Sequence, residues 1–108
     1  MNREKLHRNS ALRIAKGMKE RLLKKGVPVE KVFVFGSIIS GKIHPWSDLD
    51  VAFVCRPFGT DRIAEYNTIA GSREDFDIPM DIVFLRSEDM ENRFSTIVQE
   101  VKKNGIEV

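Results

Sequence analysis

Asp48 and Asp50 have the residue type and spacing of a cation site. They begin an apolar segment that ends at Cys55, and residues i and i+2 of a strand point to the same face of its sheet. Two carboxylates that project together repel each other, and the repulsion grows as water is excluded. Mg²⁺ suits such a pair because it usually takes one or two carboxylates together with substrate phosphates. The pair therefore predicts a divalent cation beside a phosphate.

A Gly-Ser pair, Gly36-Ser37, ends another apolar segment, and ten residues separate it from Asp48. Glycine lets the backbone approach a ligand closely. A serine near the start of a short helical turn offers a hydroxyl beside free backbone N–H groups, which favour an anion. The pair is therefore predicted to contact a phosphate. A plain helix cap is the alternative for Ser37, and the aspartates at this spacing favour the phosphate contact.

A third carboxylate, Asp81, is the only charged residue in the apolar segment MDIVFL. A carboxylate in such a segment is costly unless it is paired or binds a metal. We therefore expect Asp81 to join Asp48 and Asp50 in one metal site. The intervening loop, GKIHPWS, adds two polar residues: Lys42, which either reaches a phosphate or is solvated, and Ser47, which is expected to cap the turn before Asp48.

Apolar spacing predicts the elements that position these residues. A helix is predicted over 4–25, with Gly26 as its C-terminal cap, and a short helical turn over 37–40. Strands are predicted over 31–35, 49–55 and 80–85, whereas 106–108 either add a strand or fray. A helix over 61–71 is predicted to pack through Ile63, Ala64, Tyr66, Asn67 and Ala70. A last helix is predicted to be capped by Ser87 and to pack through Met90, Phe94, Ile97, Val98 and Val101.

The site hypothesis fixes the directions of the strands. If Ser37 and the aspartates share a site, the end of the first strand adjoins the start of the second, so these strands are antiparallel. If Asp81 joins them, the second and third strands are parallel, and the 61–71 helix supplies the crossover. The prediction is an α/β (α+β) fold, a small mixed sheet flanked by helices, with all site residues on one rim.

Composition narrows the class of protein. The 108 residues suffice for one domain, 1–108, and contain no apolar run near the roughly 20 residues that span a bilayer. The charged N-terminus lacks the apolar region of a secretory signal, so we expect a cytoplasmic protein. Cys55 is the only cysteine, which excludes an internal disulfide and a cysteine-based zinc site; we expect it to be buried in its strand.

Basic residues are concentrated at the N-terminus. Residues 1–25 hold nine Lys/Arg and two Glu, whereas residues 26–108 hold nine Lys/Arg and fourteen Asp/Glu. The basic helix over 1–26 could meet nucleic acid, a nucleotide or an acidic partner, and a solvated helix face is the alternative. Because no basic surface interleaved with aromatic residues is evident, we do not expect nucleic acid to be the partner.

The spacing Gly-Ser-X10-Asp-X-Asp, followed by a strand with a third Asp, resembles the signature of the DNA polymerase beta-like nucleotidyltransferase superfamily. The short length is similar to its minimal nucleotidyltransferase branch. The resemblance covers residues 30–108 and implies that they form the catalytic core of a nucleotidyltransferase fold. It implies two Mg²⁺ ions bound by the catalytic residues Asp48, Asp50 and Asp81. It also implies that Gly36 and Ser37 contact the triphosphate of the nucleotide, and we predict Lys42 and Ser47 as further residues of the nucleotide site.

The resemblance also implies an activity and a partner. The implied reaction is Mg²⁺-dependent transfer of a nucleoside monophosphate, AMP from ATP, to a hydroxyl on a helical HEPN-type protein, with this chain as the antitoxin of the pair. The alternative is a non-catalytic module that neutralises such a toxin by contact. Many members have an Arg-rich turn after Gly-Ser, whereas this chain has Ile38-Ile39-Ser40, with Lys42 as the possible substitute. The acceptor, the base preference and the oligomeric state, a homo-oligomer included, stay open.

Overall fold

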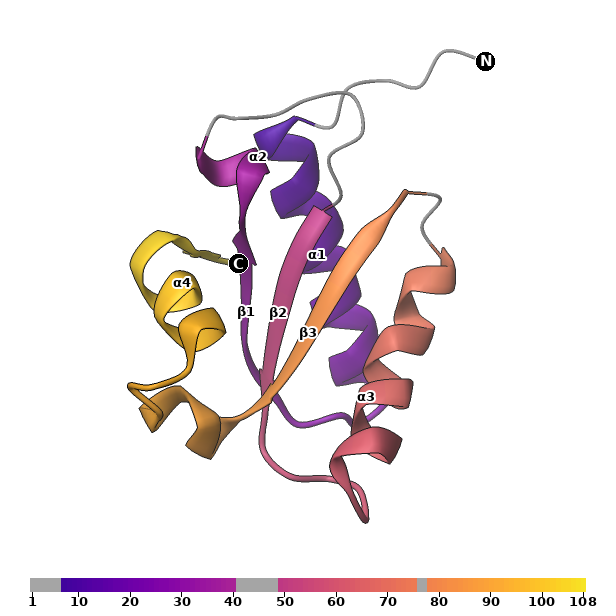
Figure 1. The fold of residues 1–108 in the computed structure, drawn as a ribbon. Helices are drawn as coiled ribbons and strands as arrows, with labels where there is room; N and C mark the ends of the chain where they lie inside the picture. The colour runs from indigo at the N-terminus through magenta and orange to yellow at the C-terminus, as the bar shows by residue number, and fades with distance from the viewer. Residues whose placement is uncertain (1–6, 41–48, 76–77) are drawn as a thin grey trace.

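The computed structural model describes residues 7–40, 49–75 and 78–108 (Figure 1). No helix within these ranges is both long and apolar enough to cross a bilayer. The elements run in the order α1 (Arg8–Lys24), β1 (Val29–Phe35), α2 (Ser37–Ser40), β2 (Leu49–Cys55), α3 (Arg62–Gly71), the 3-10 helix η1 (Ser72–Asp75), β3 (Met80–Arg86), the 3-10 helix η2 (Ser87–Glu91), α4 (Thr96–Asn104) and β4 (Ile106–Glu107).

The four strands form one mixed sheet in the order β3-β2-β1-β4. β1 and β2 are antiparallel, and β2 and β3 are parallel with α3 as the crossover, so the predicted strand directions are confirmed. β4 pairs with β1 through Ile106 and Glu107, which decides between a terminal strand and a frayed end. The ends of β1 and the beginnings of β2 and β3 meet at one end of the sheet, next to α2 (Figure 1).

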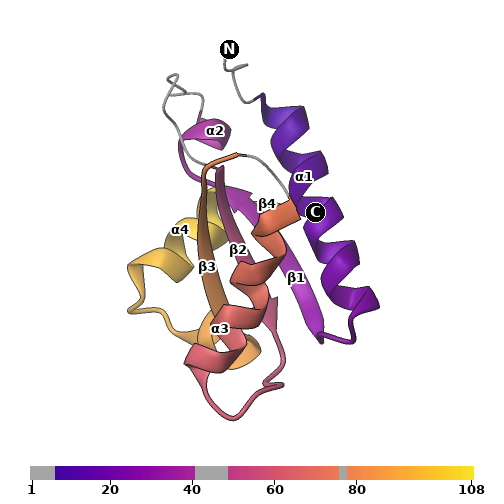
Figure 2. The same cartoon turned by 90° about the vertical axis from the view of Figure 1, so that its right-hand side faces the viewer.

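Helices cover both faces of the sheet. Figure 2 shows α1 and α4 on opposite sides of it. One face, formed in β2 by Leu49, Val51, Phe53 and Cys55, packs with the buried residues of α1, which are Ala11, Ala15, Met18 and Leu22. The other face, which includes Ala52 and Val54, packs with Val98 and Val101 of α4. The residues of β2 therefore alternate between the two faces of the sheet.

The predicted inner face of α3 is wrong. Glu65 and Ile69 are its buried residues, whereas Ile63 is 74% exposed and Tyr66 is also exposed. Ala64 and Asn67 face solvent too, and of the predicted stripe only Ala70 packs against the core. The apolar spacing predicts the wrong face because a glutamate normally lies on the solvent side of a helix, whereas Glu65 lies in the middle of the buried face of α3.

The start of the last helix also differs from the prediction. Ser87 begins η2, and α4 begins only at Thr96, with the Ser95 hydroxyl accepting a hydrogen bond from Val98 N at 3.3 Å. Phe94 precedes the helix and is 90% exposed. The Asn92 side chain accepts the Phe94 N–H at 3.0 Å and so turns the chain between the two helices. The other predicted contacts are confirmed, since Met90, Ile97, Val98 and Val101 pack against the core.

A buried carboxylate joins three segments at the far end of the sheet. The fully buried Glu65 accepts hydrogen bonds from Phe58 N at 2.6 Å, Gly59 N at 3.2 Å and Arg86 Nε at 2.8 Å. Arg86 Nη2 lies 2.7 Å from the same carboxylate. Burial alone would raise the pKa of Glu65, but the backbone and guanidinium donors outweigh it and hold the pKa below its ordinary value. The network ties α3 to the loop after β2 and to the end of β3.

Cys55, the last residue of β2, lies close to this network and is fully buried, as predicted. Burial, together with the negative charges of Glu65 and Glu30, raises the pKa of its thiol to about 12. The thiol is therefore protonated in the folded protein at neutral pH, in keeping with a packing position in the strand rather than a nucleophile.

We expect Glu65→Gln to lower the melting temperature, because an amide leaves the half-buried Arg86 without its counter-charge. The pKa of Glu65 is lowered by folding, so its contribution is complete above the unfolded value of about 4.3 and is lost as pH falls through the lower folded value. Thermal melts at pH 7 and pH 3 should therefore show a larger gap between wild type and variant at pH 7.

Glu88→Gln is the control, because the Glu88 side chain is 68% exposed. It should melt close to wild type at both pH values. A Glu65→Gln variant as stable as wild type at pH 7 would contradict the structural importance of the network.

Candidate active site

Two of the three predicted carboxylates are neighbours. Asp50 and Asp81 are direct partners in the parallel pairing of β2 with β3, and adjacent strands are about 4.8 Å apart. Alternation along β2 puts Asp50 on the same face as Ala52 and Val54, which is the face that α4 covers further along. Asp81, as its register partner, lies on this face too. Asp50 is half-buried and Asp81 is exposed, so the pair is open to solvent on one side.

Gly36 is in direct contact with Asp50. Its φ is +79°, a conformation that other residues rarely adopt. A Cβ atom built on Gly36 would lie 2.0 Å from Asp50 Oδ2 and 2.8 Å from Asp50 Cγ. The carboxylate of Asp50 therefore packs against the Cα of Gly36, and both the turn and the contact require glycine.

Ser37 lies at the same end of the sheet. It is the first residue of α2, and the Ile39 N–H donates to the Gly36 carbonyl at 3.1 Å. Ile38 is buried and anchors the short helix in the core, while Ser37 itself is half-buried. Because Phe35 pairs with Asp50, the Gly-Ser turn follows directly after the residue opposite that carboxylate.

The remaining predicted site residues, Asp48, Lys42 and Ser47, lie outside the residues that the structure describes. Within the described ranges no group of three or more His, Cys, Asp or Glu is arranged to hold a metal ion. The described part of the site contributes the pair of Asp50 and Asp81. Two carboxylates side by side on neighbouring strands are oxygen donors of the kind that Mg²⁺ prefers, so the described residues fit that ion.

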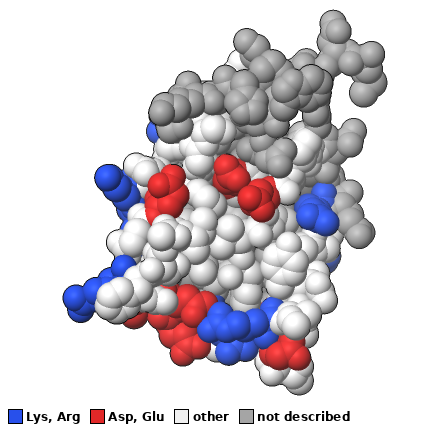
Figure 3. Space-filling model, viewed as in Figure 1, with Lys and Arg blue, Asp and Glu red and all other residues white. Residues whose placement is uncertain are grey.

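The described part of the site carries the negative charges of Asp50 and Asp81. Figure 3 shows carboxylates in the upper half of this face of the molecule, with lysines or arginines to their left and right. A site of this charge favours a cation, and it disfavours a triphosphate that arrives without one.

The contact between Gly36 and Asp50 is not among the contacts predicted from the sequence, which give Gly36 only a phosphate contact. The sequence nevertheless contains a signal for it. Antiparallel pairing of the first two strands brings the end of the first against the start of the second, so that Phe35 lies opposite Asp50 and Gly36 comes next to it. A glycine at such a position is the residue that leaves room for a side chain from the neighbouring strand.

A family model and several solved structures are similar to this chain. The model described as "Polymerase beta, Nucleotidyltransferase" matches residues 18–108. A Sulfolobus solfataricus protein described as a candidate nucleotidyltransferase has a TM-score of 0.64 at 18% identity, covering 90% of this chain and 78% of that one. No curated protein sequence matches the chain significantly.

Toxin–antitoxin complexes are among the similar structures. One, a complex with AMP-PNP, has a TM-score of 0.56 at 23% identity and covers 85% of this chain and 70% of that one. Another contains a tri-AMPylated HEPN toxin of Shewanella oneidensis with its MNT antitoxin, with a TM-score of 0.53 at 20% identity and coverage of 89% and 70%. At these identities the likeness shows a shared fold.

We expect Gly36→Ala to destabilise the protein more than Gly26→Ala. Both glycines have a positive φ, 79° and 84°, so both substitutions carry the same kind of backbone strain. A Cβ at Gly26 meets nothing within 4 Å, whereas one at Gly36 collides with Asp50. The collision should cost an additional ~1–3 kcal/mol of unfolding free energy, which urea denaturation of the two variants measures. Equal losses would show that Asp50 is not held against Gly36.

Proposed function

The chain belongs to the polymerase beta nucleotidyltransferase family, and from that membership we infer that it transfers a nucleoside monophosphate from a nucleoside triphosphate to a hydroxyl group. The observation that carries this inference is the pairing of Asp50 with Asp81 on one face of the sheet, beside the Gly36-Ser37 turn. These four residues belong to the spacing that resembles the signature of the superfamily.

In this proposal Asp50 and Asp81, together with Asp48, hold Mg²⁺ at the edge of the sheet. When bound, Mg²⁺ neutralises charge on the triphosphate and lowers the pKa of the acceptor hydroxyl. Gly36 keeps the Asp50 carboxylate in place, and the Ser37 hydroxyl donates a hydrogen bond to a phosphate oxygen. Lys42 and Ser47 stay predicted contacts to the nucleotide.

The proposed reaction is an in-line displacement. The acceptor oxygen forms a bond to the α-phosphorus, the bond between that phosphorus and pyrophosphate breaks, and pyrophosphate leaves. Asp81 is the group that takes the hydroxyl proton, because its carboxylate is exposed whereas Asp50 is half-buried against Gly36. An exposed carboxylate can meet a hydroxyl that arrives on a large acceptor.

We further propose that ATP is the donor and that the acceptor is a HEPN-type protein, with this chain as its antitoxin. The structures with AMP-PNP and with an AMPylated HEPN toxin support this proposal through the shared fold. A second function is supported by one feature of the sequence: the segment Gly36–Ser40 contains no arginine, and Ile38 is buried. A turn that lacks a cation for the phosphates suits a module that neutralises its partner by contact alone.

We expect Asp50→Asn and Asp81→Asn each to reduce label transfer from α-³²P-ATP to a purified HEPN-type partner by ~100-fold or more. Asp61→Asn is the matched control, because Asp61 accepts from Ala64 N at the start of α3 and asparagine is an equally good cap. The control should label its partner at the wild-type rate. If the wild-type chain neutralises its partner although no label is transferred to that partner, the result would instead support the contact-only module.

The site also predicts an effect of metal on stability. Like charges directly opposite each other in a sheet are destabilising, so Asp81→Asn should melt no lower than wild type in EDTA. Adding Mg²⁺ should raise the melting temperature of wild type, through preferential binding to the folded state, and should leave the variant nearly unchanged. Equal Mg²⁺ shifts in both proteins would exclude Asp81 as a metal ligand.

A further inference from the structure

Phe94 is the most exposed large apolar side chain within the described ranges, at 90%. It lies on a fixed turn between η2 and α4. The Phe94 N–H donates to Asn92 Oδ1 at 3.0 Å, the Ser95 N–H donates to the Asn92 carbonyl at 3.3 Å, and Ser95 in turn caps α4. The ring is thus held out in solvent by a hydrogen-bonded backbone, which preorganises it for contact with another surface.

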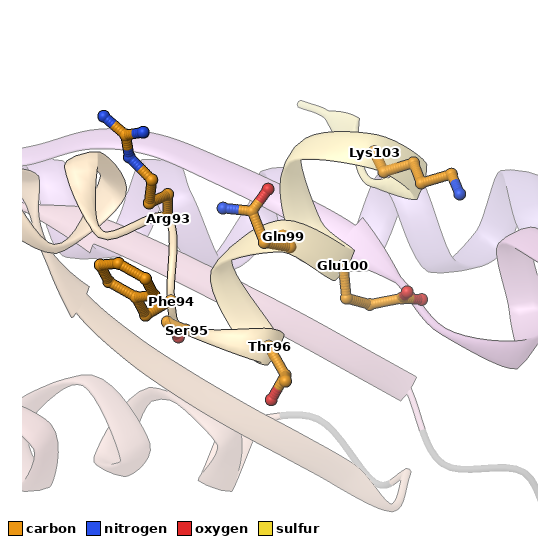
Figure 4. A pocket seen from close by; sticks show the side chains of 7 residues that line it. All are labelled: Arg93, Phe94, Ser95, Thr96, Gln99, Glu100 and Lys103. Carbon is orange, nitrogen blue, oxygen red and sulfur yellow. The ribbon is translucent and has the colours of Figure 1, made fainter.

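A shallow hollow of about 280 Å³ adjoins the ring (Figure 4). Figure 4 shows Phe94 and Arg93 at one end of it and Lys103 at the other, with Gln99 between them. Arg93 and Lys103 form no ion pair with any residue that the structure describes. The carboxylate of Glu100, which also lines the hollow, accepts a hydrogen bond from Asn104 at 3.0 Å. An apolar ring beside Arg93, with Lys103 at the other end of the hollow, is complementary to an apolar recess bordered by carboxylates.

The hollow is on the same side of the sheet as the candidate active site. α4 packs through Val98 and Val101 on the face to which Asp50 and Asp81 belong, and α1 covers the opposite face. A large acceptor that brings a hydroxyl to Asp81 therefore approaches from the side of α4. Figure 3 shows a broad surface without charged groups below the carboxylates of this face, as is usual at the centre of a protein interface.

We propose that Phe94, Arg93 and the outer side of α4, formed by Thr96, Gln99 and Lys103, dock the acceptor protein. Phe94 enters an apolar recess of the acceptor, and Arg93 and Lys103 pair with carboxylates at the border of that recess. The occupant is a protein rather than a nucleic acid, because a phosphate backbone laid along this face would meet Glu100 and the carboxylates of Asp50 and Asp81. The inference rests on the proposed function, since it names the surface that its acceptor uses.

The test is the affinity of the chain for the HEPN-type protein of the same genome, measured by calorimetry without ATP. Phe94→Arg should weaken binding at least ~30-fold, the loss typical of an aromatic residue at the centre of an interface. Ile63→Arg is the matched control: Ile63 is 74% exposed, but it lies on α3. This control should bind like wild type. Equal affinities of wild type and Phe94→Arg, or equal losses in both variants, would overturn the docking surface.

Further measurements separate this inference from the proposed function. Asp81→Asn should lower the rate of label transfer even when the acceptor is saturating, whereas the loss of transfer in Phe94→Arg should shrink as the acceptor concentration rises. If the wild-type chain transfers no label but Phe94→Arg still weakens binding, the result would contradict the proposed transferase activity and support the docking surface. Salt-sensitive binding of a single-stranded 20-nucleotide RNA that Arg93→Ala abolishes would overturn the proposal that a protein docks on this surface.

Discussion

The register between β2 and β3 is the constraint on which the candidate site depends. Side chains alternate along a strand, so a slip of one residue would turn Asp50 and Asp81 to opposite faces. The register is held by burial on both sides of β2: Val51 and Phe53 pack towards α1, and Ala52 and Val54 pack towards α4. A slip would exchange these two sets and bury a carboxylate, so the apolar core fixes the distance between two groups that repel each other.

The two ends of β3 are stabilised in different ways. At its far end Arg86 and the fully buried Glu65 form a satisfied ion pair that ties the crossover helix to the sheet. At the other end Asp81 is exposed and faces another carboxylate. The charge of Glu65 is thus paired within the protein, at the end of β3 that holds the crossover helix. The charge of Asp81 is accessible to a ligand, at the end of β3 where the reaction is proposed. The contrast is typical of a functional site in a well-packed domain.

Much of the fold was predictable, because apolar runs mark the strands and the site hypothesis fixes their directions. The second strand and the Ser37–Ser40 turn have the predicted bounds. The rotation of α3 was not predictable, since a glutamate that takes four donors from distant segments has the local pattern of a solvent-facing residue. The start of α4 was missed because Phe94 continues a helical apolar period while Asn92 breaks the helix. For the site, the sequence identified the carboxylates but not the packing of Asp50 on Gly36, which depends on contact between strands.

The reactivity of the Cys55 thiol can report local opening of the sheet. Thiol reagents react with the thiolate, and a thiol with a pKa of about 12 that is sealed in the central strand offers almost none at neutral pH. Labelling therefore requires an opening that exposes the end of β2 where Cys55 pairs with Arg86. With a single cysteine in the chain, the rate of alkylation reports the opening of that end of the sheet, without any introduced probe.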